Sequence, residues 1–233
     1  MGWDYSLSAS KLNILKDCPR CFWFHMTKKI ERPRGIFPSL PSGMDRIIKE
    51  YFDTYRGSMP PELRPHVPGV LWGTKEEIGK LRQWQSGMKP ILNTPHGSVS
   101  LIGAIDDLCI HDGLYASVDG KTKGAAYKGD TARYYQVNAD VYSLMLRETG
   151  RPPSPYSYFF YVWPEGIAGG AITTLPMTFN FQVASITADP ERAMTMIRHA
   201  TELLRTTDPK KGPDAAMTCE YCNHHHALKA AGF

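Results

Sequence analysis

The chain contains no uninterrupted run of about 18 apolar residues, so its sequence offers no membrane-spanning helix. Its first residues, MGWDYSLSASKLN, lack a basic segment followed by an apolar core, which argues against a secretory signal. It has no internal repeat, no low-complexity tract and no P-loop motif, which excludes a solenoid and the nucleotide site of most helicases. From these absences we expect a globular, cytoplasmic protein.

The composition that remains is ordinary for a globular protein. The chain has 233 residues, of which 42% are hydrophobic and 21% are charged, and this is enough for one domain with a substantial core. The formal net charge is +4, and the basic residues are scattered along the chain. That balance is compatible with a polyanionic partner, and equally with a solvated surface.

Helical and strand-like segments alternate along the chain. Amphipathic spacing and capping residues predict helices at 6–26 (with a break at Pro19), 44–56, 74–87, 132–149 and 189–205. Apolar, β-branched and aromatic segments predict strands at 98–110, 114–121, 155–163 and 169–185, and Pro- and Gly-rich stretches predict loops at 32–43 and 57–69. Together they predict one α/β or α+β domain with mostly antiparallel strands.

A hairpin is the strongest local signal in the middle of the chain. Asp112 and Gly113 separate two strand-like segments, and an Asp-Gly pair in such a place favours a two-residue turn. With that turn, Asp106 lies directly opposite Asp119, with their Cβ atoms about 4.5–5.5 Å apart. Because side chains alternate along a strand, Lys121 lies on the same face as Asp119.

Two carboxylates this close repel one another unless a positive charge compensates them. Mg²⁺ is a suitable ion, because it takes a few carboxylates together with water and phosphate oxygens. The nearby Lys121 could then orient an attacking water or stabilise negative charge on a phosphate. The alternative is a solvent-facing strand on which Lys121 simply pairs with an aspartate.

The same residues resemble a nuclease motif. The motif is Gly-x-x-Asp on one strand and Asp-x-Lys-Thr on the next, and it is matched by Gly103, Asp106, Asp119, Lys121 and Thr122. In this respect the chain resembles the PD-(D/E)XK nuclease superfamily, in particular its RecB-like branch. The resemblance implies a restriction-endonuclease-like core, a mixed central sheet flanked by helices, and Mg²⁺- or Mn²⁺-dependent hydrolysis of DNA phosphodiesters. It also implies that Asp106 and Asp119 hold the metal while Lys121 assists the attacking water.

The helix predicted at 132–149 adds to the resemblance. The RecB-like branch has a Gln-x-x-x-Tyr motif there, thought to contact DNA and the catalytic site. Tyr142 fits the tyrosine, Asn138 stands at the glutamine position, and Gln136 lies two residues earlier. An ordinary polar helix face is the alternative.

The chain departs from the branch in an early helix, which often carries a His and a later Glu that contribute to metal binding. The helix predicted at 44–56 contains no His. Asp45 and Glu50 are the candidate substitutes, so the full ligand set of the metal is open.

The five cysteines form two C-x-x-C pairs and one single residue. Cys18 and Cys21 lie early in the chain and Cys219 and Cys222 late, so a shared metal would tie the two ends together. Four thiolates suit a tetrahedral Zn²⁺ or an iron–sulfur cluster, and spacing alone does not choose between them. Cys109, alone in a predicted strand, is interpreted as a small buried hydrophobe.

Several RecB-like nucleases, including a CRISPR-associated group, join their termini with a 4Fe–4S cluster. The segment CPRCFWF resembles their early cysteine motif, so the resemblance favours a structural 4Fe–4S cluster over Zn²⁺. Their usual division is one early and three late cysteines, whereas this chain has two and two.

These signals predict a single PD-(D/E)XK nuclease domain spanning 1–233, with a catalytic hairpin at 99–123, a motif helix at 132–149 and a cysteine clasp joining 18–21 to 219–222. We expect an exonuclease acting on DNA ends or single strands in repair, recombination or CRISPR-type processing, with a helicase, recombination or CRISPR protein as a potential partner. The alternatives are a non-catalytic nucleic-acid-binding protein with a structural metal clasp, and a zinc-ribbon-like interaction protein. The distance between the cysteine pairs disfavours the ribbon, whose ligands lie much closer together.

Overall fold

The computed structural model describes residues 4–33, 35, 39–129, 131–170 and 173–232. The chain divides into two compact units, each made of separate segments. Unit 1 comprises Met1–Ile36, Lys89–Ile102 and Glu191–Phe233, and unit 2 comprises Phe37–Met88 and Gly103–Pro190. The single domain spanning the whole chain stays a prediction.

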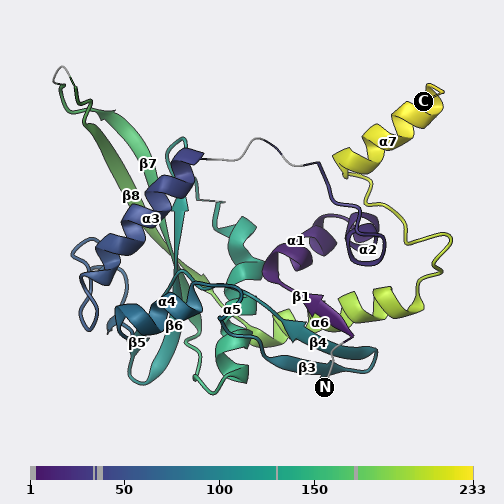
Figure 1. The fold of residues 1–233 in the computed structure, drawn as a ribbon, viewed down its shortest axis with the longest axis horizontal. Coiled ribbons are helices and arrows are strands. Elements are labelled where there is room, and N and C mark those ends of the chain that lie inside the picture. The colour runs from purple at the N-terminus through teal and green to yellow at the C-terminus, as the bar shows by residue number, and fades with distance from the viewer. Residues whose placement is uncertain (1–3, 34, 36–38, 130, 171–172, 233) are drawn as a thin grey trace. The chain divides into compact units, whose positions relative to one another are not determined.

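Unit 1 contains a three-stranded sheet in the order β1-β4-β3, in which β1 and β4 are parallel and β3 and β4 are antiparallel. Its strands are β1 (Tyr5–Leu7), β3 (Ile91–Thr94) and β4 (Gly97–Leu101). Its helices, drawn in purple and yellow-green in Figure 1, are α1 (Ala9–Asp17), α2 (Pro19–Thr27), α6 (Pro190–Thr206) and α7 (Glu220–Ala230). Ser8 caps α1 by accepting a hydrogen bond from the backbone of Lys11, and Pro19 begins α2, so the predicted cap and break are confirmed.

Unit 2 contains a mixed five-stranded sheet in the order β2-β5-β6-β7-β8. Its strands are β2 (Val70–Leu71), β5 (Asp107–His111), β6 (Leu114–Thr122), β7 (Tyr156–Ile167) and β8 (Met177–Thr187). β6 and β7 are parallel and the other neighbours are antiparallel. β7 and β8 form the long ribbon at the upper left of Figure 1.

Helices cover both faces of this sheet. The helical elements of unit 2 are α3 (Ser39–Asp53), α4 (Lys75–Leu81), a 3-10 turn η1 (Thr131–Tyr135) and α5 (Gln136–Glu148). Phe52 of α3 packs with Phe160 of β7, whereas Ala139 of α5 packs with Phe159 and Tyr161. Because neighbouring residues of a strand point to opposite faces, α3 and α5 lie on opposite sides of the sheet. The predicted mixed sheet flanked by helices is confirmed.

Two of the predicted segments, 98–110 and 32–43, differ from the observed elements. The strand predicted at 98–110 is two strands in two sheets, because β4 ends at Leu101 and β5 begins at Asp107. Residues 102–106 between the two strands are largely half-buried and include apolar residues, so the sequence pattern does not mark where one sheet ends. The connector predicted at 32–43 lies partly outside the described residues, at 34 and 36–38, and from Ser39 onward it is already helical. Pro residues are tolerated in a first helical turn, where no backbone donor is lost.

Further differences between the predicted and the observed elements concern their lengths. The strands β1, β2 and β3 have two to four residues and were not predicted, because such short segments show no clear alternation. The helix predicted at 74–87 ends at Leu81. The strand predicted at 169–185 includes 171–172, outside the described residues, and its strand begins at Met177. No helix in the described part of the chain is both long and apolar enough to cross a bilayer.

Candidate active site and four-cysteine cluster

The β5–β6 hairpin has the register that the sequence predicts. Residues 112–113 have positive φ angles of 49° and 78°, as a two-residue type I′ turn requires. The segment 107–111 pairs with 114–118 in the alignment that sets Asp106 opposite Asp119. Asp106 itself lies one residue before β5 begins, at the mouth of the hairpin.

Asp106 and Asp119 form a hydrogen-bonded acid pair. Asp119 is fully buried, with 1% of its surface exposed. Burial, together with the negative charge of Asp106, raises the pKa of Asp119 well above its usual range. Burial acts to raise the pKa of Asp106 too, but the hydrogen bond with Asp119 and the ammonium of Lys49 outweigh it and lower that pKa. The two carboxyl groups are therefore shifted in opposite directions, and they titrate as a coupled pair.

Two lysines compensate the remaining charge. Lys121 lies on the same strand face as Asp119, as the sequence predicts, and forms an ion pair with it. Lys49 of α3 lies with its Nζ 2.8 Å from an oxygen of Asp106 and 2.7 Å from an oxygen of Asp45. Burial acts to lower the pKa of both lysines, but the neighbouring carboxylates raise it, so both amines are charged.

Lys49 was missed by sequence reasoning, although a signal was present. It stands four residues after Asp45, on the helix face that also carries Ile48 and Phe52, and these two residues pack into the core. A charged i, i+4 pair on a core-facing stripe is unusual, because such stripes are normally apolar. The pattern therefore marks residues that face a polar site.

The structure separates the two substitutes proposed for the missing histidine. Asp45 lines a small cavity together with Lys49, Asp106 and Gly120. Glu50 lies outside it and pairs with Arg46 on an exposed face of α3, with 56% of its side chain in solvent. The absence of a side chain at Gly120 keeps this cavity open, because a Cβ there would lie 4.0 Å from the carboxylate of Asp45.

The motif helix brings Tyr142 to the acid pair. Tyr142 is buried and its hydroxyl is hydrogen-bonded with the side chain of Asn138. Burial and the negative charges of Asp119 and Asp106 raise the pKa of Tyr142, so its hydroxyl keeps its proton. Tyr142 thus lies near the acid pair, and Asn138 contacts Tyr142.

Gly103 allows the close approach of this helix. A Cβ on Gly103 would lie 3.0 Å from the sulfur of Met145 and 3.7 Å from the ring of Tyr142. Any larger residue would push against α5, so the motif glycine has a steric cause.

Gln136 is not brought to the acid pair. Its side-chain amide donates one hydrogen bond of 2.8 Å to the carbonyl of Thr187 and one of 3.0 Å to Asp140. Asp140 in turn accepts a hydrogen bond from the backbone of Asp189. These contacts anchor the start of α5 to the end of β8, which is a structural role.

Thr122, the last residue of the predicted Asp-x-Lys-Thr motif, is the last residue of β6.

Four charged side chains form a buried network next to the acid pair. Arg56 donates two hydrogen bonds of 2.6 Å to the carboxylate of Asp107. Arg82 donates from Nε to the backbone carbonyl of Asp106 at 2.9 Å, and its terminal nitrogens reach Asp107 at 3.0 Å and Asp53 at 2.8 Å. The backbone of Asp106 is thus held by a side chain from a distant segment. No local pattern in the sequence reveals these partners.

The acid pair suits a hard divalent cation. Carboxylate oxygens are ligands of Mg²⁺ and Mn²⁺, and Mg²⁺ commonly takes one or two carboxylates and fills its other positions with water and phosphate oxygens. Asp106 and Asp119 supply two adjoining carboxylates, and Asp45 lines a small cavity together with Asp106, but Asp119 does not line it. The residues fit the ion that the motif implies.

The four paired cysteines meet in unit 1. The sulfur of Cys21 lies 3.5 Å from that of Cys219 and 3.8 Å from that of Cys222, and Cys18 lies 3.9 Å from Cys222. Within the described residues, this is the one group of three or more His, Cys, Asp or Glu side chains whose ligand atoms all lie within 4.8 Å of one another. The predicted meeting of the two ends of the chain is confirmed, and the cluster can bind a metal.

Backbone donors favour the thiolate form of one ligand. Burial acts to raise the pKa of Cys18, but the backbone amides of Cys21 and Ala216 outweigh it and lower the pKa to about 7. Arg32 adds a side-chain hydrogen bond to Cys21. Cys109, by contrast, is buried in the apolar core as predicted, and burial raises its pKa to about 12.

Comparison with known proteins leaves the family open. No family model matches the chain, and no curated protein matches it. A solved structure, the crystal structure of SSO0001, covers 90% of this chain and 80% of its own, with 11% sequence identity and a TM-score of 0.46.

Proposed function

We propose that the chain is a Mg²⁺- or Mn²⁺-dependent deoxyribonuclease of the PD-(D/E)XK type, with a restriction-endonuclease-like core in unit 2. The observation that carries the proposal is the pairing of Asp106 with the buried Asp119, with Lys121 on Asp119. These are the three positions that the motif assigns to metal and water, and they meet at one end of one hairpin.

The residues of the site have distinct roles in this proposal. Asp106 and Asp119 hold the divalent ion, which when bound polarises a phosphodiester and makes a water more acidic. Ion binding would require both carboxyl groups to be ionised, which the amine of Lys49 favours at Asp106 and the amine of Lys121 favours at Asp119. Lys121 then places a positive charge beside the position where negative charge develops on the phosphate. Tyr142 and Asn138 form the wall that faces the substrate.

The test compares variants of the acid pair with matched surface variants. Asp119→Asn and Lys121→Met should each lower the cleavage of linear single- and double-stranded DNA by about 100-fold or more, since each removes a charge that acts in the transition state. The controls are Asp112→Asn, in the exposed hairpin turn where asparagine tolerates the positive φ, and Lys128→Met. Cleavage that survives equally in all four variants would rule the active site out.

A second readout separates loss of chemistry from loss of fold. Near-ultraviolet circular dichroism and melting temperature should match between Asp119→Asn and the wild type, because asparagine keeps the shape of the protonated carboxyl group. Protein that binds DNA but never cleaves it, with any divalent ion, would favour the non-catalytic binding protein instead.

Exonuclease action is the narrower part of the proposal. An exonuclease requires a strand end, so a linear duplex should be degraded while a covalently closed circle of the same sequence is not. Equal cleavage of both forms would make the enzyme an endonuclease. The chain would act in DNA repair, recombination or CRISPR-type processing, with a helicase or a recombination or CRISPR protein as partner.

We further propose that the cysteine cluster holds a single structural Zn²⁺ and not the 4Fe–4S cluster that the resemblance implies. Sulfur atoms around a tetrahedral zinc, each about 2.3 Å from the ion, lie about 3.8 Å from one another. Three of the six sulfur separations are 3.5 to 3.9 Å and all four sulfurs lie within 4.8 Å of one another, which is close to that value, whereas four irons and four sulfides would hold the thiolates further apart. Protein purified without oxygen should be colourless with one zinc per chain; a brown protein with four irons would restore the cluster.

A further inference from the structure

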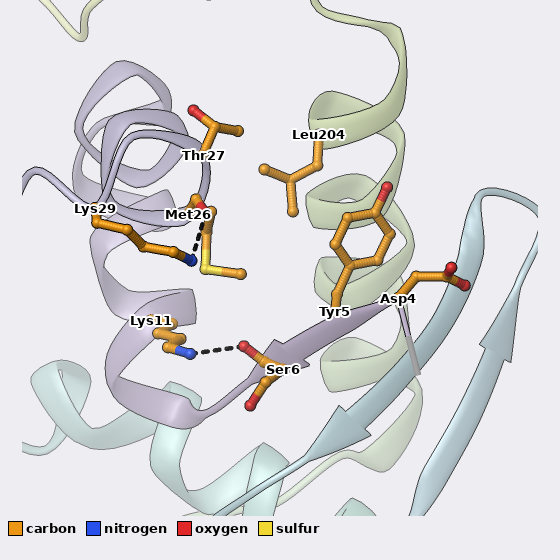
Figure 2. Close-up of a pocket in the computed structure, with 8 residues that line it drawn as sticks. All are labelled: Asp4, Tyr5, Ser6, Lys11, Met26, Thr27, Lys29 and Leu204. Atoms are coloured by element: carbon orange, nitrogen blue, oxygen red, sulfur yellow. Dashed lines mark hydrogen bonds between the residues drawn. The ribbon is translucent and has the colours of Figure 1, made fainter. Parts of the chain in front are cut away.

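Unit 1 contains a cavity of about 360 Å³ that the proposed nuclease function does not use. Small-molecule sites have volumes of roughly 300–1,000 Å³, so the cavity is large enough for a ligand. Its walls come from β1, α1, the end of α2 and α6, and Figure 2 shows the side chains that line it.

One side of the cavity carries two amines without carboxylate partners. Lys11 Nζ donates to the carbonyl of Ser6 at 2.7 Å, and Lys29 Nζ donates to the carbonyl of Met26 at 2.9 Å, as Figure 2 shows. Within the described residues neither amine forms an ion pair with a carboxylate. Lys11 is half-buried and Lys29 is exposed to solvent at the edge of the cavity. Burial and the positive charge of Lys29 lower the pKa of Lys11, and a bound anion would give both amines a counter-charge.

Asp4, an acidic residue of the cavity wall, already accepts other hydrogen bonds. Asp4 lines the same cavity, but one of its oxygens accepts hydrogen bonds from the backbone and the hydroxyl of Ser98, at 2.8 Å and 2.9 Å. These hydrogen bonds lower the pKa of Asp4 and fix its position on β4. It does not neutralise the two lysines.

Lys29 is held in an unusual backbone conformation. Its φ is 58°, in the left-handed region, and it follows the last residues of α2 at a position where glycine is most common. A non-glycine residue there costs energy, which is typical of positions whose side chain has a role.

The opposite side of the cavity is suited to a flat, weakly polar group. Figure 2 shows the ring of Tyr5 beside Leu204, across the opening from Met26 and Thr27. An aromatic ring with aliphatic neighbours stacks well on a nucleobase. The cavity thus combines a phosphate-binding side with a base-binding side.

We propose that this cavity binds a nucleotide, with its phosphate between Lys11 and Lys29 and its base against Tyr5 and Leu204. The phosphate is inferred from the amines alone, whereas the choice of a nucleotide over other organic phosphates rests on the proposed nuclease function. The nucleotide is either free or the terminal residue of a DNA strand, since both present the same chemistry.

The test measures binding to the full chain by calorimetry, in the Asp119→Asn background so that no DNA is consumed. The probes are thymidine, thymidine 5′-monophosphate, inorganic phosphate, and a short oligothymidylate with and without a 5′-phosphate. Lys11→Met and Lys29→Asn should each weaken binding of the monophosphate about tenfold, because each removes one charge-assisted hydrogen bond. Asparagine tolerates the positive φ at 29, and methionine keeps the aliphatic stem at 11.

Two further variants sharpen the result. Tyr5→Leu should weaken binding of the monophosphate while leaving inorganic phosphate unchanged, because only the base meets the ring. Lys16→Met, on the same helix as Lys11 but outside the cavity, should change nothing. A 5′-phosphorylated oligonucleotide that binds more tightly than the monophosphate assigns the cavity to strand ends, and equal affinity assigns it to free nucleotides.

The inference fails if the monophosphate binds equally to wild type, Lys11→Met and Lys29→Asn, or if thymidine binds as well as its phosphate. That outcome leaves the nuclease proposal intact, since cleavage depends on Asp119 and Lys121. Conversely, lysine-dependent binding of the monophosphate by a chain that never cleaves DNA would support the cavity and reject the nuclease.

Discussion

The cysteine cluster of unit 1 and the acid pair of unit 2 both gather potential metal ligands, but the acid pair has two cationic side chains against it and the cysteine cluster has one. Asp106 pairs with Lys49 and Asp119 pairs with Lys121, so the charge of the acid pair is compensated before any ion arrives. The four sulfurs lie within 4.8 Å of one another, with one guanidinium, that of Arg32, hydrogen-bonded to Cys21. In the proposed nuclease, a divalent ion at the acid pair would therefore be exchangeable, while a metal among the cysteines would be a permanent part of the fold.

The largest effect is expected from removing two ligands of the cysteine cluster. Replacing Cys21 and Cys222 together by serine should reduce bound metal from one equivalent to none and destabilise unit 1 by several kcal/mol, since structural zinc contributes to folding directly. Metal analysis and limited proteolysis measure this. Cys109→Ala should keep its metal, and a double variant that still binds one equivalent would contradict the assignment.

A smaller but still large effect tests the support of the acid pair. Arg82→Met leaves Asp53 and Asp107 with one arginine between them, and an unpaired buried charge costs about 3–5 kcal/mol. Urea unfolding measures the change. Arg46→Met removes a surface pair with Glu50 and should cost less than about 1 kcal/mol. Equal losses would mean that the network does not hold Asp106 in place.

A third test concerns the packing of α5 against Gly103. Gly103→Ala places a methyl group against the sulfur of Met145, and overpacking of this kind costs about 1–3 kcal/mol. Thermal unfolding should show the loss, and the same substitution in a Met145→Ala background should cost less, because the contact is gone. A cost that does not depend on residue 145 would show that the glycine serves another purpose.

The smallest expected effect separates two polar residues of the motif helix. Gln136→Ala should lower stability by about 1 kcal/mol and leave DNA cleavage nearly unchanged, because its hydrogen bonds run to Thr187 and Asp140. Asn138→Ala should slow cleavage more, since Asn138 contacts Tyr142 beside the acid pair. The reverse order would return Gln136 to the catalytic site.

The parts that sequence reasoning predicted are those fixed by neighbours in the chain. The turn at 112–113 sets the register of β5 and β6, so the acid pair follows from local rules. The C-x-x-C pairs predict thiolate ligands because few other roles need that spacing. The cap at Ser8 and the break at Pro19 are equally local.

The parts that it missed depend on contacts between distant segments. Arg56 and Asp107 are 51 residues apart, and nothing near either residue indicates the other. Lys49 reaches Asp106 only because α3 packs across the sheet, and Gln136 turns away because β8 ends beside it. The split of 98–110 into two strands likewise depends on which sheet each half joins.

The separation of Cys18 from Cys222 by 204 residues has a consequence for synthesis of the protein. The two segments of unit 2 lie between the two cysteine pairs in the chain, so that unit leaves the ribosome before the last ligand has been made. A metal can occupy the early pair alone during translation, but its four-sulfur coordination closes only when the late pair arrives. Metal capture is therefore among the last steps of assembly, and a chain cut short before Cys222 would be recognisable to proteases by its open clasp.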